Sequence, residues 1–200
     1  MGKRFFDIFC SFLGLLLLSP LLLIVAIWIK FDSRGPVFFR QLRVGLNGEL
    51  FAIHKFRTMR VDSEKLGRLT VGNDSRITNL GRFLRKSKVD ELPQLIDVFI
   101  GKMSLVGPRP EVPEFMGLYP PDVKKLVLSV RPGITDNASI EMFDENEMLF
   151  GYDDPRQAYI DHIIPLKQRY YLDYINNNSL FTDITIIIKT FIKILSKRRS

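Results

Sequence analysis

The chain has 200 residues, of which 46% are hydrophobic, and its formal net charge is +7. This length is typical of a single domain, and the slightly positive mean hydropathy of +0.05 indicates a membrane-embedded part. A pI of about 9.6 suits anionic lipids, a polyphosphate substrate or nucleic acid. The single cysteine, Cys10, excludes a disulfide framework and a cysteine zinc site.

An uncharged run near the N-terminus, Phe12 to Ile29, is long enough to cross the hydrocarbon core, since it spans about 27 Å as a helix. Ser19-Pro20 interrupts it: Pro20 removes one helical hydrogen bond, and Ser19 can satisfy a freed carbonyl. Basic residues flank the run on both sides: Lys3, Arg4, Lys30 and Arg34. The positive-inside rule keeps both ends on the cytoplasmic side. These residues leave a re-entrant helix and a bent spanning helix as alternatives.

The next segment, Pro36 to Met59, predicts a β-hairpin with its turn at Gly45 to Gly48. Lys55 and Arg57 are two residues apart, so both side chains point to one face of the second strand. Paired cations on one face suit a phosphate, and a solvated edge strand is the alternative. The polar stretch Val61 to Ser75 predicts a loop.

Two adjacent carboxylates, Asp90 and Glu91, open the next predicted helix. Asp90 fits the N-cap position, and Pro93 is tolerated in the first turn. Basic residues surround this pair in the sequence: Arg82, Arg85, Lys86, Lys88 and Arg109. Acidic groups among cations suit a site that binds phosphate and a divalent metal together, and an ordinary N-cap with surface charge is the alternative.

The C-terminal half predicts two longer helices. The aromatic and apolar stripe of Asp154 to Tyr174 indicates core packing. The amphipathic segment 179–197 either docks on the core or lies in the membrane interface. His54 and His162 are too few and too far apart in sequence for a zinc site.

Three blocks taken together carry a family resemblance: Lys55-Phe56-Arg57-Thr58-Met59, Asp90-Glu91-Leu92-Pro93-Gln94, and Ser104 to Pro110. In this order they resemble the signature of the bacterial sugar transferases, the small monotopic phosphoglycosyl transferases, and the resemblance covers roughly Lys3 to Thr135. The family carries a break like Ser19-Pro20, which favours the re-entrant helix. The chain departs from the family pattern at Asp136 to Glu141, where sugar contacts are expected, so the resemblance does not name the sugar.

The resemblance implies transfer of a phosphosugar from a UDP-sugar to polyprenol (undecaprenyl) phosphate, with release of UMP, as the first step of membrane glycan assembly. It implies Asp90 as the nucleophile of a covalent aspartyl-phosphosugar intermediate and Glu91 as the Mg²⁺ ligand. The substrate-binding candidates are Arg85 and Arg109, then Lys55 and Arg57, with Lys3 near the acceptor phosphate and Arg131 in the turn before Thr135.

We therefore expect an α+β, mainly helical fold. It comprises a re-entrant membrane helix hairpin (residues 1–32) and a catalytic domain (33–200) with a small β-hairpin and interfacial amphipathic helices. The expected location is the cytoplasmic face of the bacterial inner membrane, in contact with anionic phospholipids. No helix-turn-helix, zinc finger or RNP-like motif supports nucleic-acid binding, and the sequence leaves a homo-oligomer open.

Two other functions remain as alternatives: a membrane-bound glycosyl transferase that releases UDP, and a basic membrane-surface module without catalytic activity. The second does not explain why Asp90 and Glu91 lie among arginines, since carboxylates weaken binding to anionic lipid.

Overall fold

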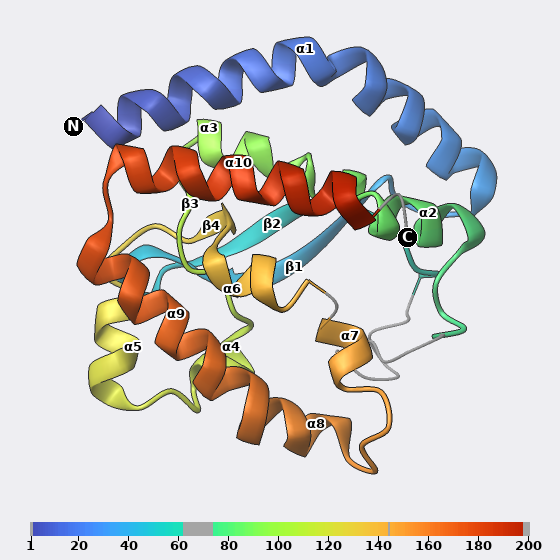
Figure 1. Cartoon of the computed structure of the whole chain (residues 1–200). Helices are drawn as coiled ribbons and strands as arrows, with labels where there is room; N and C mark the ends of the chain where they lie inside the picture. Colours follow the sequence, from blue (N-terminus) through green and yellow to red (C-terminus); the bar gives the residue numbers. More distant parts are fainter. Residues whose placement is uncertain (1, 62–73, 144, 198–200) are drawn as a thin grey trace.

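The computed structural model describes residues 2–61, 74–143 and 145–197. It has a mainly helical α+β fold with two small two-stranded sheets, which confirms the predicted fold class at this level (Figure 1). Most of the predicted loop between Val61 and Ser75 lies outside the described residues. The helices after the first hairpin are α2 (Asn79–Lys86), α3 (Gln94–Phe99), α4 (Pro113–Met116), α5 (Pro121–Val127), α6 (Asn137–Glu141), α7 (Glu145–Met148), α8 (Pro155–Ala158), α9 (Ile164–Asn177) and α10 (Leu180–Lys197).

Helix α1 (Gly2–Asp32) is one continuous helix that contains Pro20. It bends gradually along its length rather than forming the two arms of a hairpin (Figure 1). The Ser19 hydroxyl donates a 2.8 Å hydrogen bond to the carbonyl of Leu16, which is the carbonyl that Pro20 leaves without its helical donor. This local compensation explains how α1 accepts Pro20 without ending. By length and composition, α1 could cross a membrane.

Both ends of α1 are attached to the same globular body. Near its N-terminus, the buried Asp7 carboxylate accepts hydrogen bonds from the Ser104 hydroxyl and the Leu105 amide, each at 3.1 Å. Near its C-terminus, the buried Ile29 packs in a cluster with Leu84. The exposed middle of the helix therefore forms an arch over the rest of the molecule (Figure 1).

The predicted hairpin is confirmed, with β1 (Phe38–Val44) and β2 (Leu50–Phe56) paired antiparallel. The turn needs a left-handed backbone at Gly48 (φ 84°), which glycine adopts without steric cost. Phe51 and Ile53 alternate with outward residues along β2 and pack against the loop and helix that follow the acidic motif. The hairpin thus forms one wall beside that motif.

The second sheet consists of β3 (Ser104–Val106) and β4 (Gly133–Thr135), which pair in parallel. The segment after β3 and the start of β4 are so close that a Cβ atom at Gly133 would lie 2.1 Å from the backbone nitrogen of Gly107. Glycine is therefore required at this crossing, and the tight packing fixes the turn that carries Arg109.

The predicted helix from Asp154 to Tyr174 forms as α8, a π-helical turn at Tyr159–Ile163, and α9. Its predicted role in the core is confirmed, since Tyr159 and Tyr174 are buried. Helix α10 has the opposite arrangement. Its apolar stripe is exposed, as Ile188 shows, while Asp183 and Ile186 face the body. Most of the stripe therefore does not dock on the core, although its Ile187 packs against the buried cluster that contains Ile186.

Candidate active site

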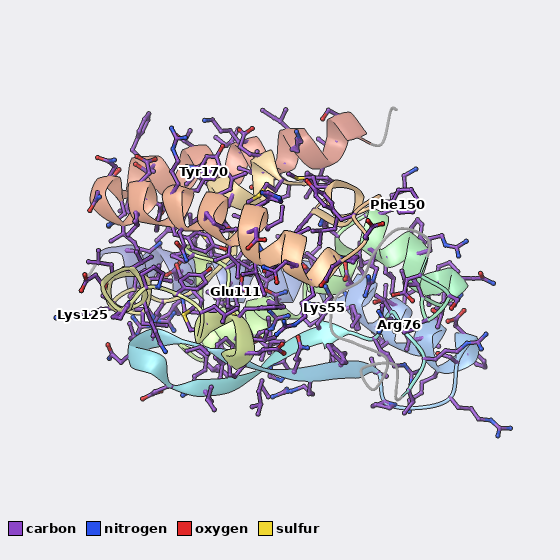
Figure 2. All side chains as sticks on the ribbon, turned by 90° about the horizontal axis from the view of Figure 1, so that it is seen from below. Lys55, Arg76, Glu111, Lys125, Phe150 and Tyr170 are labelled. Carbon is purple, nitrogen blue, oxygen red and sulfur yellow. The ribbon has the colours of Figure 1, made fainter. Side chains whose placement is uncertain are left out.

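A cavity of about 2030 Å³ contains the acidic motif. It is lined by residues of α1, the hairpin, the segment from α2 to α3, and α10. Lys55 and Glu111, which both line it, lie between the hairpin and the C-terminal helices (Figure 2). The cavity thus brings together residues from both ends of the chain.

The local structure around Asp90 differs from the prediction. Residues Val89–Glu91 form a 3₁₀ turn, and α3 begins only at Gln94, with Pro93 at its N-cap. Asp90 is therefore not the N-cap of this helix, and the helix start does not hold its charge. Proline, which lacks an N–H, is itself well suited to the start of a helix. The helix therefore starts a few residues later in the chain than predicted.

The Asp90 carboxylate is held by a cation from the hairpin instead. Its Oδ2 lies 2.8 Å from the Nζ of Lys55, and the residue is only 1% exposed. Its Oδ1 is also buried and accepts no hydrogen bond from the described residues. A buried carboxylate oxygen without a donor is costly, so such an atom is expected to meet a ligand or to react.

Glu91 is held by two cations. The Arg109 guanidinium binds both carboxylate oxygens, with 3.2 Å between Nη1 and Oε2, and the Nζ of Lys55 lies 3.1 Å from Oε1. Burial raises the pKa of Glu91, but Arg109 and Lys55 more than offset this effect and hold the pKa well below its usual range. Glu91 is consequently a permanent anion in the neutral range.

Arg85 and Arg57, two other predicted phosphate ligands, differ in their hydrogen-bond partners. Arg85 lines the cavity, and its Nε donates a 2.8 Å hydrogen bond to the Thr58 hydroxyl. Burial lowers the pKa of Arg85, and the nearby Asp90 counteracts this shift. Arg57 also borders the cavity, but its guanidinium donates to the backbone carbonyls of Ser33 and Arg34 at the end of α1. The hydrogen bonds of Arg57 therefore indicate a structural contact with the end of α1, and its predicted pairing with Lys55 at a phosphate stays a prediction.

Lys3 and Arg131 are not among the residues that line the cavity. The Nζ of Lys3 forms an ion pair of 2.5 Å with Asp183 and so joins α1 to α10. The Nε of Arg131 donates to the carbonyl of Gly101 at 2.9 Å. Both residues thus make contacts outside the cavity, and their predicted role in substrate binding stays a prediction.

A second buried cluster of charges borders the same cavity, and sequence reasoning missed it. Glu111 accepts a 2.9 Å hydrogen bond from the Tyr159 hydroxyl and lies 3.5 Å from the Nζ of Lys167. The same Nζ donates to the Tyr159 oxygen at 2.8 Å and pairs with Glu145 at 2.8 Å. Its one sequence signal is a lysine within the otherwise aromatic and apolar face of α9.

The cavity wall opposite these charges is apolar. Helix α1 contributes Phe6, Gly14 and Leu18, which recur at multiples of four residues and therefore share one face. Helix α10 contributes Phe191 and Ile194. The cavity therefore joins a charged region to a largely apolar wall from α1 and α10, to which α10 also contributes Lys193.

Comparison with known proteins agrees with this arrangement. The family model described as "Bacterial sugar transferase" matches residues 1–197. The chain belongs to the bacterial sugar transferase family. The resemblance drawn from the Lys55, Asp90 and Ser104 blocks is thereby confirmed.

Several curated proteins are similar to this bacterial sugar transferase. An undecaprenyl-phosphate glucose phosphotransferase of Komagataeibacter xylinus is 41% identical over 95% of the chain and 35% of its own length. A UDP-glucose:undecaprenyl-phosphate glucose-1-phosphate transferase of Xanthomonas campestris pv. campestris is 37% identical over 99% of the chain and 40% of its own length. The exopolysaccharide production protein ExoY of Rhizobium meliloti (strain 1021) is 35% identical over 100% of the chain and 88% of its length. The chain thus spans well under half of the first two relatives.

The donor atoms of the transferase cavity fit a divalent cation bound mainly by substrate. Among the described residues, no group of three or more His, Cys, Asp or Glu side chains is placed so that it could hold a metal ion. In the acidic pair, two oxygen lone-pair positions are open to a cation. One is Asp90 Oδ1, which has no hydrogen-bond partner among the described residues, and the other is the second lone pair of Glu91 Oε2. One or two carboxylates completed by phosphate oxygens and water are typical of Mg²⁺.

Proposed function

We propose that this bacterial sugar transferase moves a sugar phosphate from a UDP-sugar to polyprenol (undecaprenyl) phosphate, releases UMP, and so initiates a membrane glycan. The observation that carries this proposal is the composition of its cavity. The buried Asp90, the adjacent Glu91 and their cations form one region, and apolar residues of α1 and α10 form the other. A diphosphate donor fits the charged region, and a lipid with a phosphate head fits the junction between the two.

In the proposed first step, Asp90 Oδ1 attacks the phosphorus that bears the sugar. A carboxylate–phosphorus bond forms, and the bond from that phosphorus to the oxygen of UMP breaks, so UMP leaves with the electron pair. Lys55 supports this step because its ammonium binds Oδ2 and leaves Oδ1 free. An oxygen of polyprenol phosphate then attacks the same phosphorus, and the Asp90 carboxylate is released unchanged.

The cations supply charge neutralisation for this reaction. Arg109 and Arg85 line the cavity beside the dyad and can bind phosphate oxygens in a bidentate manner. A Mg²⁺ ion, held through Glu91, would offset the charge of the diphosphate and of the departing UMP. The protein contribution is to keep Glu91 ionised, which the contacts with Arg109 and Lys55 achieve.

We further propose a monotopic position on the cytoplasmic face of the bacterial inner membrane. A helix whose two ends contact one body cannot place them on opposite sides of a bilayer, and the contacts of Asp7 and Ile29 hold both ends of α1 in this way. Helix α10, which the Lys3–Asp183 ion pair joins to the N-terminal end of α1, exposes an apolar stripe that supports the same location. Basic residues at both ends of α1 favour anionic phospholipid headgroups.

The product of the reaction tests the proposed activity. The protein in nanodiscs is incubated with Mg²⁺ and a panel of UDP-sugars, with and without undecaprenyl phosphate. We expect UMP in both cases and, without acceptor, a mass increase of one phosphosugar that is absent in Asp90→Asn. Release of UDP would identify a glycosyl transferase instead. Release of UMP only with acceptor, and without an adduct, would contradict the covalent intermediate.

The metal assignment has its own test. We expect UMP with Mg²⁺ to raise the thermal midpoint of the wild type, and we expect Glu91→Gln to lose the part of this shift that depends on Mg²⁺. Lys102→Gln, on the surface near β2, serves as the matched control. An unchanged Mg²⁺ response in Glu91→Gln would contradict the assignment of Glu91 as the metal ligand.

A further inference from the structure

Lys88 is a cavity residue to which no role has yet been given. It lies two residues before Asp90, is half-buried and lines the cavity. Its backbone is in the left-handed region (φ 56°, ψ 14°), which is unfavourable for a residue with a long side chain. Residues held in such a conformation are concentrated at functional sites, because the surrounding structure has to enforce them.

Lys88 differs from the neighbouring cations in the groups that it contacts. Three cations lower the pKa of Glu91, and two of them, Arg109 and Lys55, contact the dyad directly. Lys88 forms no ion pair with any residue in the described part of the chain. Its Nζ instead lies 4.7 Å above the centre of the Phe143 ring. Lys88 thus holds a positive charge beside the dyad that no carboxylate of the described residues contacts.

We propose that Lys88 binds the diphosphate of the nucleotide-sugar donor, an inference that rests on the proposed function. Lys55 and Arg109 already contact the charges of Asp90 and Glu91, and Lys88 adds a further cation to those that Arg109 and Arg85 offer to a diphosphate. A half-buried ammonium with unused donors is a suitable ligand for that anion.

The position of Lys88 favours the donor over the lipid acceptor. Its ring partner Phe143 lies between α6 and α7, and α7 lies apart from α1 (Figure 1). The apolar wall that suits a lipid chain is formed by α1 and α10. Lys88 is therefore expected to act in the half-reaction that consumes the donor.

The backbone of Lys88 permits a test that separates binding from folding. Lys88→Gly removes the ammonium and places the residue that best tolerates a left-handed conformation, so the thermal midpoint should stay the same or rise. We expect kcat/KM for the UDP-sugar to fall about tenfold or more, because a charge-assisted hydrogen bond is lost. Lys88→Arg keeps the charge and should remain within about threefold of the wild type. Lys88→Asn, which also tolerates this backbone, is the second variant.

Lys125→Gln is the charge-matched control. Lys125 is exposed on α5 and lies far from Lys55 (Figure 2). We expect it to leave kcat/KM unchanged. Calorimetric binding of UDP with Mg²⁺ gives a readout that does not depend on turnover, and Lys88→Gly should weaken it by a similar factor.

Two outcomes would overturn the inference: unchanged UDP affinity in both Lys88→Gly and Lys88→Asn, or a loss confined to kcat/KM for the lipid acceptor. A wild type that binds UDP but forms no UMP from any UDP-sugar would reject the proposed function. The UDP affinities of the variants would still decide whether Lys88 binds a diphosphate.

Discussion

Two clusters of buried charge border the same cavity, and they differ in how completely their polar atoms are paired. In the Glu111 cluster, the carboxylate accepts from Tyr159, and Lys167 contacts three oxygen-bearing side chains. In the Asp90 pair, one carboxylate oxygen has no donor among the described residues. The charges of the Glu111 cluster are paired with one another, whereas an unpaired buried carboxylate oxygen is available for chemistry.

This difference separates a structural from a reactive use of similar residues. Lys55 and Lys167 both neutralise buried carboxylates, yet Lys55 is 22% exposed at its side chain and Lys167 only 5%. The Asp90 pair therefore remains accessible to a substrate in the cavity. We expect substitutions in the Asp90 pair to reduce activity more than stability, and substitutions in the Glu111 cluster to do the reverse.

The largest expected effect is on turnover. Asp90→Asn retains the shape of the side chain but removes the nucleophile, so we expect UMP release to fall about 10³-fold or more. The thermal midpoint should change little, because Lys55 keeps its contact with Glu91. Initial rates of UMP release and thermal unfolding in the same detergent would measure both effects. A variant that lost its fold along with its activity would make the two clusters indistinguishable.

The next effect is on stability. Lys167→Met removes the cation in contact with the buried Glu111 and leaves only Arg43 to offset its charge, so we expect the free energy of unfolding to fall by about 3–5 kcal/mol. Equilibrium unfolding in denaturant would measure this loss. Lys55→Met is the comparison variant, and its stability should fall less because its side chain is more exposed. An equal loss in both variants would remove the distinction between the clusters.

The pH dependence of stability gives a smaller effect with a defined sign. Burial raises the pKa of Glu111, but Lys167 and Arg43 outweigh it, and the net pKa lies below the ordinary 4.5. Folding then favours the ionised form, so this stabilisation is complete above about pH 4.5 and is lost as the pH falls toward the lower folded-state pKa. We therefore expect the stability of Glu111→Gln to decline less steeply below about pH 4.5 than that of the wild type. Denaturant unfolding between pH 3 and pH 7 would record it, and parallel curves would contradict the assignment.

The smallest effect is expected for Tyr159→Phe. This change removes one hydroxyl from the Glu111 cluster and leaves Lys167 in contact with Glu111. We expect a loss of about 1–2 kcal/mol in the free energy of unfolding, below that of Lys167→Met. The double variant Lys167→Met/Tyr159→Phe should lose less than the sum of the single changes, because the two groups share partners. Additive losses would show that the cluster is not a single network.

Several features could be predicted because they depend on neighbouring residues. The apolar run of α1, the hairpin turn and the buried stripe of α9 follow from local hydrophobicity and periodicity. The compensation at Pro20 by Ser19 likewise acts within one helical turn. The predicted start of α3 is wrong although its signals are also local, because Asp90 and Pro93 both fit a helix start and the sequence does not rank them.

The sequence by itself determined which residues carry charge and that Asp90 and Glu91 are adjacent. Only the tertiary structure decided which cations reach them, because a side chain's partner depends on how distant elements pack. Lys55 reaches Glu91 across 36 residues, while Arg57, two positions later, turns to the end of α1. Lys167 meets Glu111 across 56 residues. Such pairs follow from the packing of hairpin, helices and loops around one cavity, which no local pattern specifies.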